Sequence, residues 1–326
     1  TMEASWFSPS VIADRLGAIG TLLPRERAQT TMYYRQKVLL ALLESFGGKL
    51  ASTDFQKYLF LYSRLCEKDR SYEFVPYKYG CFSFQSYADK SKLVASGYLE
   101  DAKDWKLSDS FNNHTAQLKK DDAGKIQLFH DKYVSLKGKK LLQHVYRGYP
   151  YYAINSLVAN EILTADEYAA VQKLKAPKKG KLFATIGYEW ITVEEYLNKL
   201  IENNIRLLVD VRKNPLSRKY GFSKTKLSEL LNNVGISYKH LPKLGIVSDK
   251  RKSLKTSQDY KNLFSTYEKT VIPEEKDTIA ELYDFYLDSA RIAITCFEEC
   301  HTMCHRHKVA DAVAGIANSR FKVVHL

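Results

Sequence analysis

The sequence predicts an α/β protein, with a mainly parallel, Rossmann-like sheet covered by helices on both faces and preceded by a mostly helical, winged-helix-like domain. Three observations lead to this prediction. After residue 181, short and nearly continuous apolar runs alternate with amphipathic stretches, a pattern typical of parallel strands buried on both faces. Before residue 175, apolar residues recur mostly at helical spacing. Hydrophobic residues make up 45% of the chain, which is enough for each domain to bury a core.

The chain of 326 residues is expected to form two domains. We place a helical domain at residues 32–174, a basic linker at 175–181 and an α/β domain at 182–326. Residues 1–31 precede "MYYRQKVLLALLESF", which looks like a natural protein start. We interpret them as an arm or a wrongly chosen start and leave them out of the fold prediction.

The first domain is predicted to combine several helices with one hairpin. Helices are expected in "QKVLLALLESF", "DFQKYLFLYSRL", around residues 83–95 and in "VSLKGKKLLQHVY". Thr53 and Gln56 resemble a capping box for the second of these. "AQLKKDDAGKIQLF", residues 116–129, is interpreted as two strands around an Asp-Ala-Gly turn. This combination is the build of a winged helix.

The second domain alternates strands and helices. Strands are predicted in "KLFATIGY", "IRLLVDVR", "ISYKHL", "RIAITCF" and "FKVVHL". Helices are predicted in "VEEYLNKLIENN", "KTKLSELLNNV", "SQDYKNLFSTYEK", "DTIAELYDFYLDS" and "HRHKVADAVAGIA", the first of them capped by Thr192 and Glu195. Ligands of such sheets bind at the carboxyl ends of the strands.

Polar side chains gather where three of these strands end. They are Thr185, Gly187, Tyr188 and Glu189 after the first strand, Asp210, Arg212, Ser217 and Arg218 after the second, and Cys296, Glu298, Glu299, Cys304, His305 and Arg306 after the fourth. In a parallel sheet these groups share one edge, so the sequence predicts a site there.

The densest group of reactive side chains is "CFEECHTMCHR", residues 296–306. A zinc site built from Cys296, Cys300, Cys304 and a histidine, a thiol redox pair and a nucleophilic Cys304 are all possible uses. Structural zinc favours Cys-x-x-Cys pairs with a distant second pair, so we expect no metal and no cofactor. The preferred interpretation is a helix start that holds a phosphate with its N–H groups, His305 and Arg306.

Asp210 and Glu298 are the candidate catalytic carboxylates. Asp210 has an alternative role as a loop cap or as the partner of Arg212. Tyr188, Phe222 and Tyr238 lie near the same predicted edge, where aromatic rings either pack in the core or stack on an extruded base.

The net charge of +13 predicts a polyanionic partner, most often nucleic acid. The alternative is a basic surface without a partner. No uncharged apolar run of about 18 residues occurs, so we expect no membrane span. The cysteines show no disulfide framework and fit a reducing compartment, so we expect a cytoplasmic location. The oligomeric state does not follow from the sequence.

Four segments of the second domain carry a resemblance to a known family. "TIGYE", "LLVDVRKNPLSRKYGFSK", "GISYKHLPKLG" and "CFEECHTMCHR" are similar, in order and spacing, to the family called domain of unknown function 488. In the first domain, "FVPYKYGCFSF", "VSLKGKKLL" and "YPYYAINS" resemble the Panacea domain of SocA-like antitoxins. The first resemblance implies a role in prokaryotic, anti-phage defence on nucleic acid, and the second implies a regulatory module.

We therefore expect a DNA-acting hydrolase that cleaves a base–sugar bond as a DNA glycosylase does, with Asp210 or Glu298 activating water. One alternative is a nuclease or phosphoesterase that uses the Cys-His-Arg segment. Another is a nucleic-acid sensor or antitoxin-like adaptor that breaks no bond.

Overall fold

The α/β prediction is confirmed by a computed structural model of the chain, in which the second half builds a five-stranded parallel sheet. The structure describes residues 32–109, 113–175, 180–247, 249, 254–316, 318 and 321–326, with only the backbone of Ser257. The predicted arm at residues 1–31 lies outside them, as does most of the predicted linker. By its internal contacts, Met32–Leu326 is one compact unit, and the division into two domains stays a prediction.

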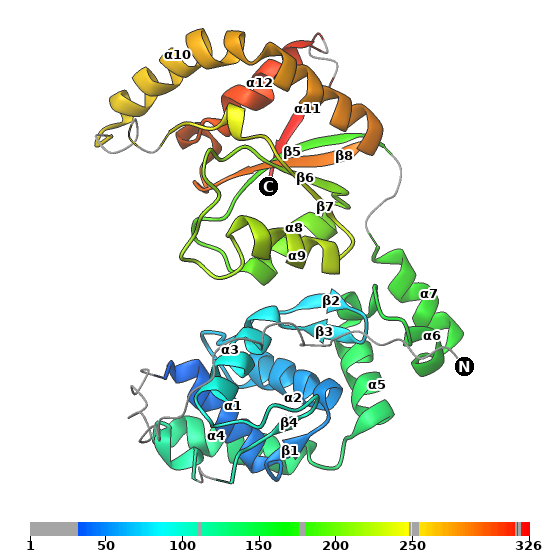
Figure 1. The fold of residues 1–326 in the computed structure, drawn as a ribbon. Helices are drawn as coiled ribbons and strands as arrows, with labels where there is room; N and C mark the ends of the chain where they lie inside the picture. The colour runs from blue at the N-terminus through cyan, green and yellow to red at the C-terminus, as the bar shows by residue number, and fades with distance from the viewer. Residues whose placement is uncertain are drawn as a thin grey trace, which may run out of the picture. The chain divides into compact units, whose positions relative to one another are not determined.

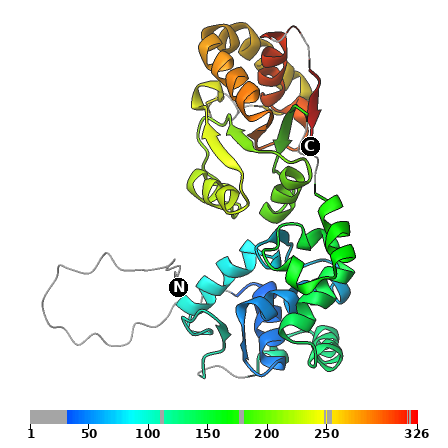
Figure 2. The same ribbon diagram turned by 90° about the vertical axis from the view of Figure 1, so that its right-hand side faces the viewer.

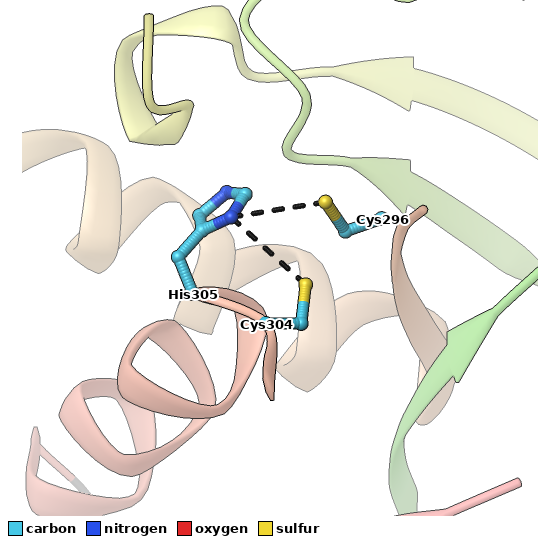
Figure 3. A group of neighbouring side chains, drawn as sticks. All are labelled: Cys296, Cys304 and His305. Carbon is cyan, nitrogen blue, oxygen red and sulfur yellow. Dashed lines mark hydrogen bonds between the residues drawn. The ribbon is translucent and has the colours of Figure 1, made fainter. Parts of the chain in front are cut away.

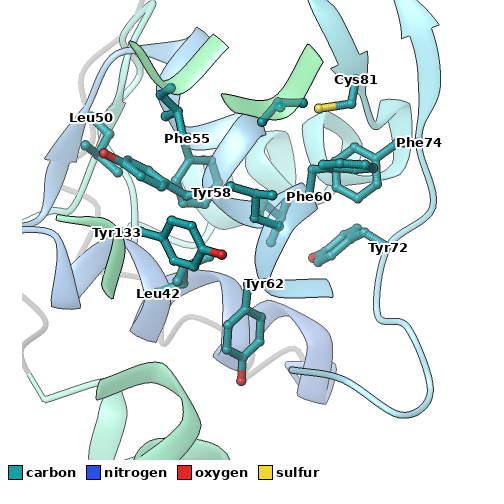
Figure 4. Packing of buried hydrophobic residues seen from close by; sticks show 14 of the residues in the cluster. Leu42, Leu50, Phe55, Tyr58, Phe60, Tyr62, Tyr72, Phe74, Cys81 and Tyr133 are labelled. Carbon is teal, nitrogen blue, oxygen red and sulfur yellow. The ribbon is translucent and has the colours of Figure 1, made fainter. Parts of the chain in front are cut away.

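The first half is mostly helical, with two short antiparallel sheets. Its helices are α1 (Tyr34–Ser45), α2 (Ser52–Leu65), α3 (Phe84–Ala95), α4 (Lys120–Tyr133), α5 (Gly138–Gly148), α6 (Ala159–Ile162) and α7 (Ala165–Lys173). Strand β1 (Lys49–Leu50) pairs with β4 (Trp105–Lys106), and β2 (Val75–Tyr77) pairs with β3 (Gly80–Phe82). Helix α2 is central, since every residue from Phe55 to Ser63 is buried. Figure 4 shows its aromatic side chains packed in the core.

The hairpin predicted at residues 116–129 is wrong, because most of this segment forms α4. Ile126, Phe129 and Tyr133 are buried, which is the spacing of one helix face. Asp121 and Asp122 occupy the first turn, where carboxylates favour a helix. The helical part has its true hairpin at β2 and β3.

The sheet of the second half has the strand order β7-β6-β8-β5-β9, and every pair is parallel. Its strands are β5 (Leu182–Gly187), β6 (Leu207–Asp210), β7 (Ser237–His240), β8 (Arg291–Cys296) and β9 (Val323–His325). Its helices are α8 (Val193–Glu202), α9 (Lys224–Asn233), α10 (Ser257–Glu274), α11 (Lys276–Ser289) and α12 (Arg306–Ile316).

Helices cover both faces of this sheet, as predicted. Figure 1 and Figure 2 show α8 and α9 on one face and α10, α11 and α12 on the other. Neighbouring residues of one strand serve opposite faces: Ala184 packs with the α8 and α9 side, and Phe183 packs with the α10 to α12 side. No helix within the described residues is both long and apolar enough to span a bilayer.

Candidate functional site

The strand connections open a crevice at the carboxyl end of β8. The chain leaves β5 and β6 toward α8 and α9 on one face, and it leaves β8 toward α12 on the other. Strand β8 lies between β5 and β6. Loops that diverge from adjacent parallel strands leave space between them, and ligands of open α/β sheets bind there.

At the end of β5, Gly187 allows two loops to touch. A Cβ on this glycine would lie 1.9 Å from the backbone oxygen of Glu298. The next residue, Tyr188, donates its backbone N–H to the Phe297 carbonyl at 3.0 Å. The segment that follows β8 is therefore held directly against the end of β5.

At the end of β6, Asp210 and Arg212 form a buried ion pair. Asp210 is 0% exposed, and its carboxylate accepts from the backbone N–H, Nε and Nη2 of Arg212 and from the hydroxyl of Tyr238. Burial lowers the pKa of Arg212, but hydrogen bonds and the charge of Asp210 outweigh it, so the net pKa shift is upward. The guanidinium of Arg212 therefore stays charged and is fixed in place by these contacts.

Arg212 in turn organises the aromatic wall of the site. Its Nη1 donates to the hydroxyl of Tyr188 at 2.6 Å and to the carbonyl of Phe222 at 2.9 Å. The rings of Tyr188 and Phe222 stack at 4.2 Å with an interplanar angle of 8°. Tyr188 is 3% exposed and Phe222 is 0% exposed, so this stack is mainly part of the core. The carboxylate of Asp210 thus faces Arg212 and Tyr238, and its role as a water-activating base stays a prediction.

At the end of β8, two cysteines and a histidine converge (Figure 3). The Nδ1 atom of His305 lies 3.7 Å from Sγ of Cys296 and 4.0 Å from Sγ of Cys304. His305 and Cys296 are each 1% exposed, and Cys304 is 0% exposed. Nε2 of His305 lies 3.1 Å from the carbonyl of Val211. Because a carbonyl only accepts, Nε2 donates to it, and Nδ1 faces the two thiols.

Glu298 lies beside this cluster. Its Oε2 is 3.6 Å from Sγ of Cys296, and its side chain is partly exposed. Burial, reinforced by Cys296, raises the pKa of the Cys304 thiol well above its usual value.

Arg306 is buried at the start of α12, and its predicted role of holding a phosphate stays a prediction. It is 1% exposed and donates to the carbonyls of Glu298 and Glu299 and to the hydroxyl of Thr185. Thr185 also contacts Nδ1 of His325 at 2.8 Å. These contacts make Arg306 the support of the loop after β8, and its guanidinium faces protein oxygens.

A pocket of 310 Å³ opens over the cluster. Its lining consists of Tyr188, Arg212, Lys213, Asn214, Leu216, Ser217, Arg218, Ile246, Cys296, Phe297 and His305. The side chains of Lys213 and Arg218 are exposed at its rim. Among the described residues, this lining contains Lys213, Arg218 and the ion-paired Arg212 but no carboxylate, so the pocket favours an anionic ligand.

The pocket therefore includes some predicted site residues and excludes others. Tyr188, Arg212, Ser217, Arg218 and His305 line it. The lining does not contain Thr185, Gly187, Asp210, Phe222, Tyr238, Glu298, Cys304 or Arg306.

Sequence reasoning missed several lining residues. Lys213 and Asn214 directly follow Arg212, so their position after a strand end was a usable signal. Ile246 comes from a distant loop and gave no local signal. Gly245 explains its approach, because a Cβ there would lie 2.1 Å from the backbone nitrogen of Lys213.

Three of the four segments that carry the family resemblance, residues 207–224, 235–245 and 296–306, lie in the part of the chain that the family model matches, and "TIGYE" precedes that part. Residues 192–313 match the family described as Domain of unknown function DUF488. The DUF488 match spans β6, β7 and β8 and the pocket residues that follow them, and β5 with Tyr188 lies just outside it. It does not extend into the helical part, where the resemblance to the Panacea domain stays a prediction. Comparison with curated proteins and with solved structures finds no match for the chain.

Proposed function

We propose that this protein is a DNA-acting hydrolase whose pocket at the carboxyl end of β8 receives a phosphate-bearing nucleotide. The observation that carries the proposal is the pocket lining. Lys213 and Arg218 present exposed cations at the rim, the charge of Arg212 is balanced by Asp210, and the described lining contains no carboxylate. A volume of 310 Å³ lies at the small end of the range for small-molecule sites, which suits a single nucleotide unit.

The bond that we propose is the base–sugar bond, with Glu298 as the catalytic carboxylate. Such hydrolysis needs a carboxylate that orients water and stabilises a cationic sugar. Asp210 has this chemistry, but its oxygens already accept from Arg212 and Tyr238. Glu298 is partly exposed and adjoins the lining residue Cys296. The geometry therefore favours Glu298 over Asp210.

The cellular setting that we propose is prokaryotic anti-phage defence in the cytoplasm. This part rests on the DUF488 resemblance and on the net charge of +13. All five cysteines are free, which is compatible with a reducing compartment.

Product analysis tests the reaction. Purified protein is incubated with modified and unmodified duplex and single-stranded DNA. Release of free base, with strands that break only after alkali, supports the glycosylase. Direct nicks support the alternative of phosphoester cleavage by the Cys-His-Arg segment. Unchanged DNA that is nevertheless bound supports the sensor.

The matched pair Glu298→Gln and Glu299→Gln tests the assignment of the carboxylate. Glu299 is the neighbouring, exposed carboxylate. We expect Glu298→Gln to lose roughly 10²- to 10⁴-fold in rate, the usual contribution of a general acid or base, and Glu299→Gln to stay near wild type. Equal rates for the two variants would remove Glu298 from the mechanism.

A further inference from the structure

We propose that Cys296, Cys304 and His305 bind a zinc ion at the floor of the pocket. This differs from the expectation, drawn from the sequence, that the protein has no metal. Each residue offers one ligand atom, and the three atoms lie within 4.8 Å of one another. All three side chains are at most 1% exposed.

The distances within the cluster match the edges of a metal tetrahedron. With Zn–S near 2.3 Å and Zn–N near 2.0–2.1 Å, a tetrahedral angle places nitrogen and sulfur about 3.6 Å apart. The observed separations from Nδ1 of His305 are 3.7 Å to Cys296 and 4.0 Å to Cys304. These two nitrogen-to-sulfur separations therefore reach the tetrahedral value after shifts of a few tenths of an ångström.

Both buried thiols point at Nδ1 of His305 (Figure 3). The thiol of Cys296 also lies 3.6 Å from Oε2 of Glu298. A metal ion would bring the two sulfur atoms and the nitrogen onto one centre.

The other ring nitrogen of His305 is also held as it is in metal-bound histidines. Nε2–H of His305 donates to the carbonyl of Val211. Such a bond fixes the ring and the tautomer of a metal ligand. The ligand atom is already aimed at the cysteines before any ion arrives.

The donor set selects zinc among the common divalent ions. Two thiolates and one imidazole are soft to borderline ligands, whereas Mg²⁺ and Ca²⁺ prefer oxygen. Two thiolates also balance the charge of Zn²⁺, so the buried centre is neutral overall.

The fourth position of this site would face the pocket. Cys296 and His305 both line the pocket, and Cys304 lies behind them. Glu298 contacts Cys296 at 3.6 Å but does not belong to the group of mutually close ligands. Three protein ligands with an open position are typical of catalytic zinc. The site would thus deepen the proposed hydrolase by binding water or a ligand oxygen beside Glu298. The ion itself does not rest on that function.

Metal content of the full chain tests the proposal. The protein is expressed with zinc in the medium, purified with a reductant and without chelator, and its metals are measured by mass spectrometry. Cys296→Ser, Cys304→Ser and His305→Ala are compared with Cys300→Ser. Cys300 is the matched control, because it belongs to the same segment but is exposed and outside the cluster.

We expect about one zinc per chain in the wild type and in Cys300→Ser, and at least a tenfold loss of affinity in the three cluster variants. Refolding with Co²⁺ gives a second readout, a thiolate-to-cobalt absorption that Cys300→Ser keeps and Cys304→Ser loses. Metal-free protein with free Cys296 and Cys304 thiols, a disulfide between them, or equal metal loss in Cys300→Ser would each overturn the zinc site. Bound zinc without any DNA product would overturn the proposed hydrolase and leave the zinc site standing.

Discussion

At the residue scale, the charged side chains of the site fall into two groups. One group is buried and fixes the geometry of the pocket wall, and the other is exposed at the pocket rim. Asp210 and Arg306 are buried, and their polar atoms contact other parts of the protein. Lys213 and Arg218 are exposed at the pocket rim. A buried, saturated charge contributes to geometry, whereas an exposed cation beside a pocket contributes to binding.

Replacing Asp210 tests its positioning role. We expect Asp210→Asn to lower the free energy of unfolding by roughly 3–5 kcal/mol, because it leaves the buried guanidinium of Arg212 without its counter-charge. Asp284→Asn, on an exposed part of α11, is the control and should change stability by about 0.5 kcal/mol or less. Urea unfolding measures both. A variant of Asp210 with wild-type stability and no cleavage would instead make this carboxylate catalytic.

At the element scale, close contact between the end of β5 and the loop after β8 shapes the site. Gly187 permits that contact, since a Cβ would overlap the Glu298 carbonyl. The overlap is with backbone, which has little freedom to move aside.

Two glycine substitutions distinguish the loss of this backbone contact from the general effect of replacing a glycine by alanine. We expect Gly187→Ala to displace Glu298, to lower activity at least tenfold and to destabilise the fold. Gly124→Ala in α4 meets nothing within 4 Å and should stabilise the protein by about 0.5–1 kcal/mol, because alanine is the better helix former. Thermal unfolding and the cleavage assay read out both. Normal activity in Gly187→Ala would show that the loop tolerates a shift.

Helix α8 carries a buried carboxylate at the start of α3. Glu194 is 1% exposed and accepts from the backbone N–H of Gln85 at 2.7 Å and from the hydroxyl of Ser83 at 3.2 Å. Burial raises its pKa to about 7, and the hydrogen bonds only partly oppose that shift. The folded state therefore binds this proton more tightly than the unfolded state, whose glutamate has its ordinary pKa near 4.5.

Stability should consequently fall as the pH rises from about 4.5 to about 7. One pKa unit corresponds to about 1.36 kcal/mol, so the contribution of Glu194 amounts to about 3 kcal/mol across this window. We expect Glu194→Gln to be more stable than wild type at pH 8 and nearly equal to it at pH 5. Urea unfolding at both values measures the difference. A variant that is less stable than wild type at pH 8 would contradict this account.

At the scale of the whole molecule, the net charge of +13 predicts DNA binding dominated by phosphate contacts. Affinity should fall steeply with salt, with a log–log slope of about −0.9 for each neutralised phosphate. Arg218→Ala should make that slope shallower by about 0.9, the contribution of one phosphate contact, whereas Lys226→Ala should leave it unchanged. Lys226 is paired with Glu229 on α9. Fluorescence anisotropy over a salt series measures the slopes, and affinity independent of salt would exclude phosphate-dominated binding.

The elements of the α/β half, their order and the edge that carries the site follow from the sequence alone. Apolar periodicity and caps are local signals, and a parallel sheet places every strand end on one edge. The same local reasoning misplaced a hairpin on α4, where Asp-Ala-Gly imitates a turn within a helical pattern.

Only the tertiary structure decided which of the gathered side chains remain available for chemistry. Asp210 and Arg306 have the residue types of an active site, yet packing directs them at Arg212 and at backbone carbonyls. Cys296, at the end of β8, meets Cys304 and His305 because the intervening loop folds back to the start of α12. Such partners depend on loop paths and on close backbone contacts such as that at Gly187, which no local pattern of residue types encodes.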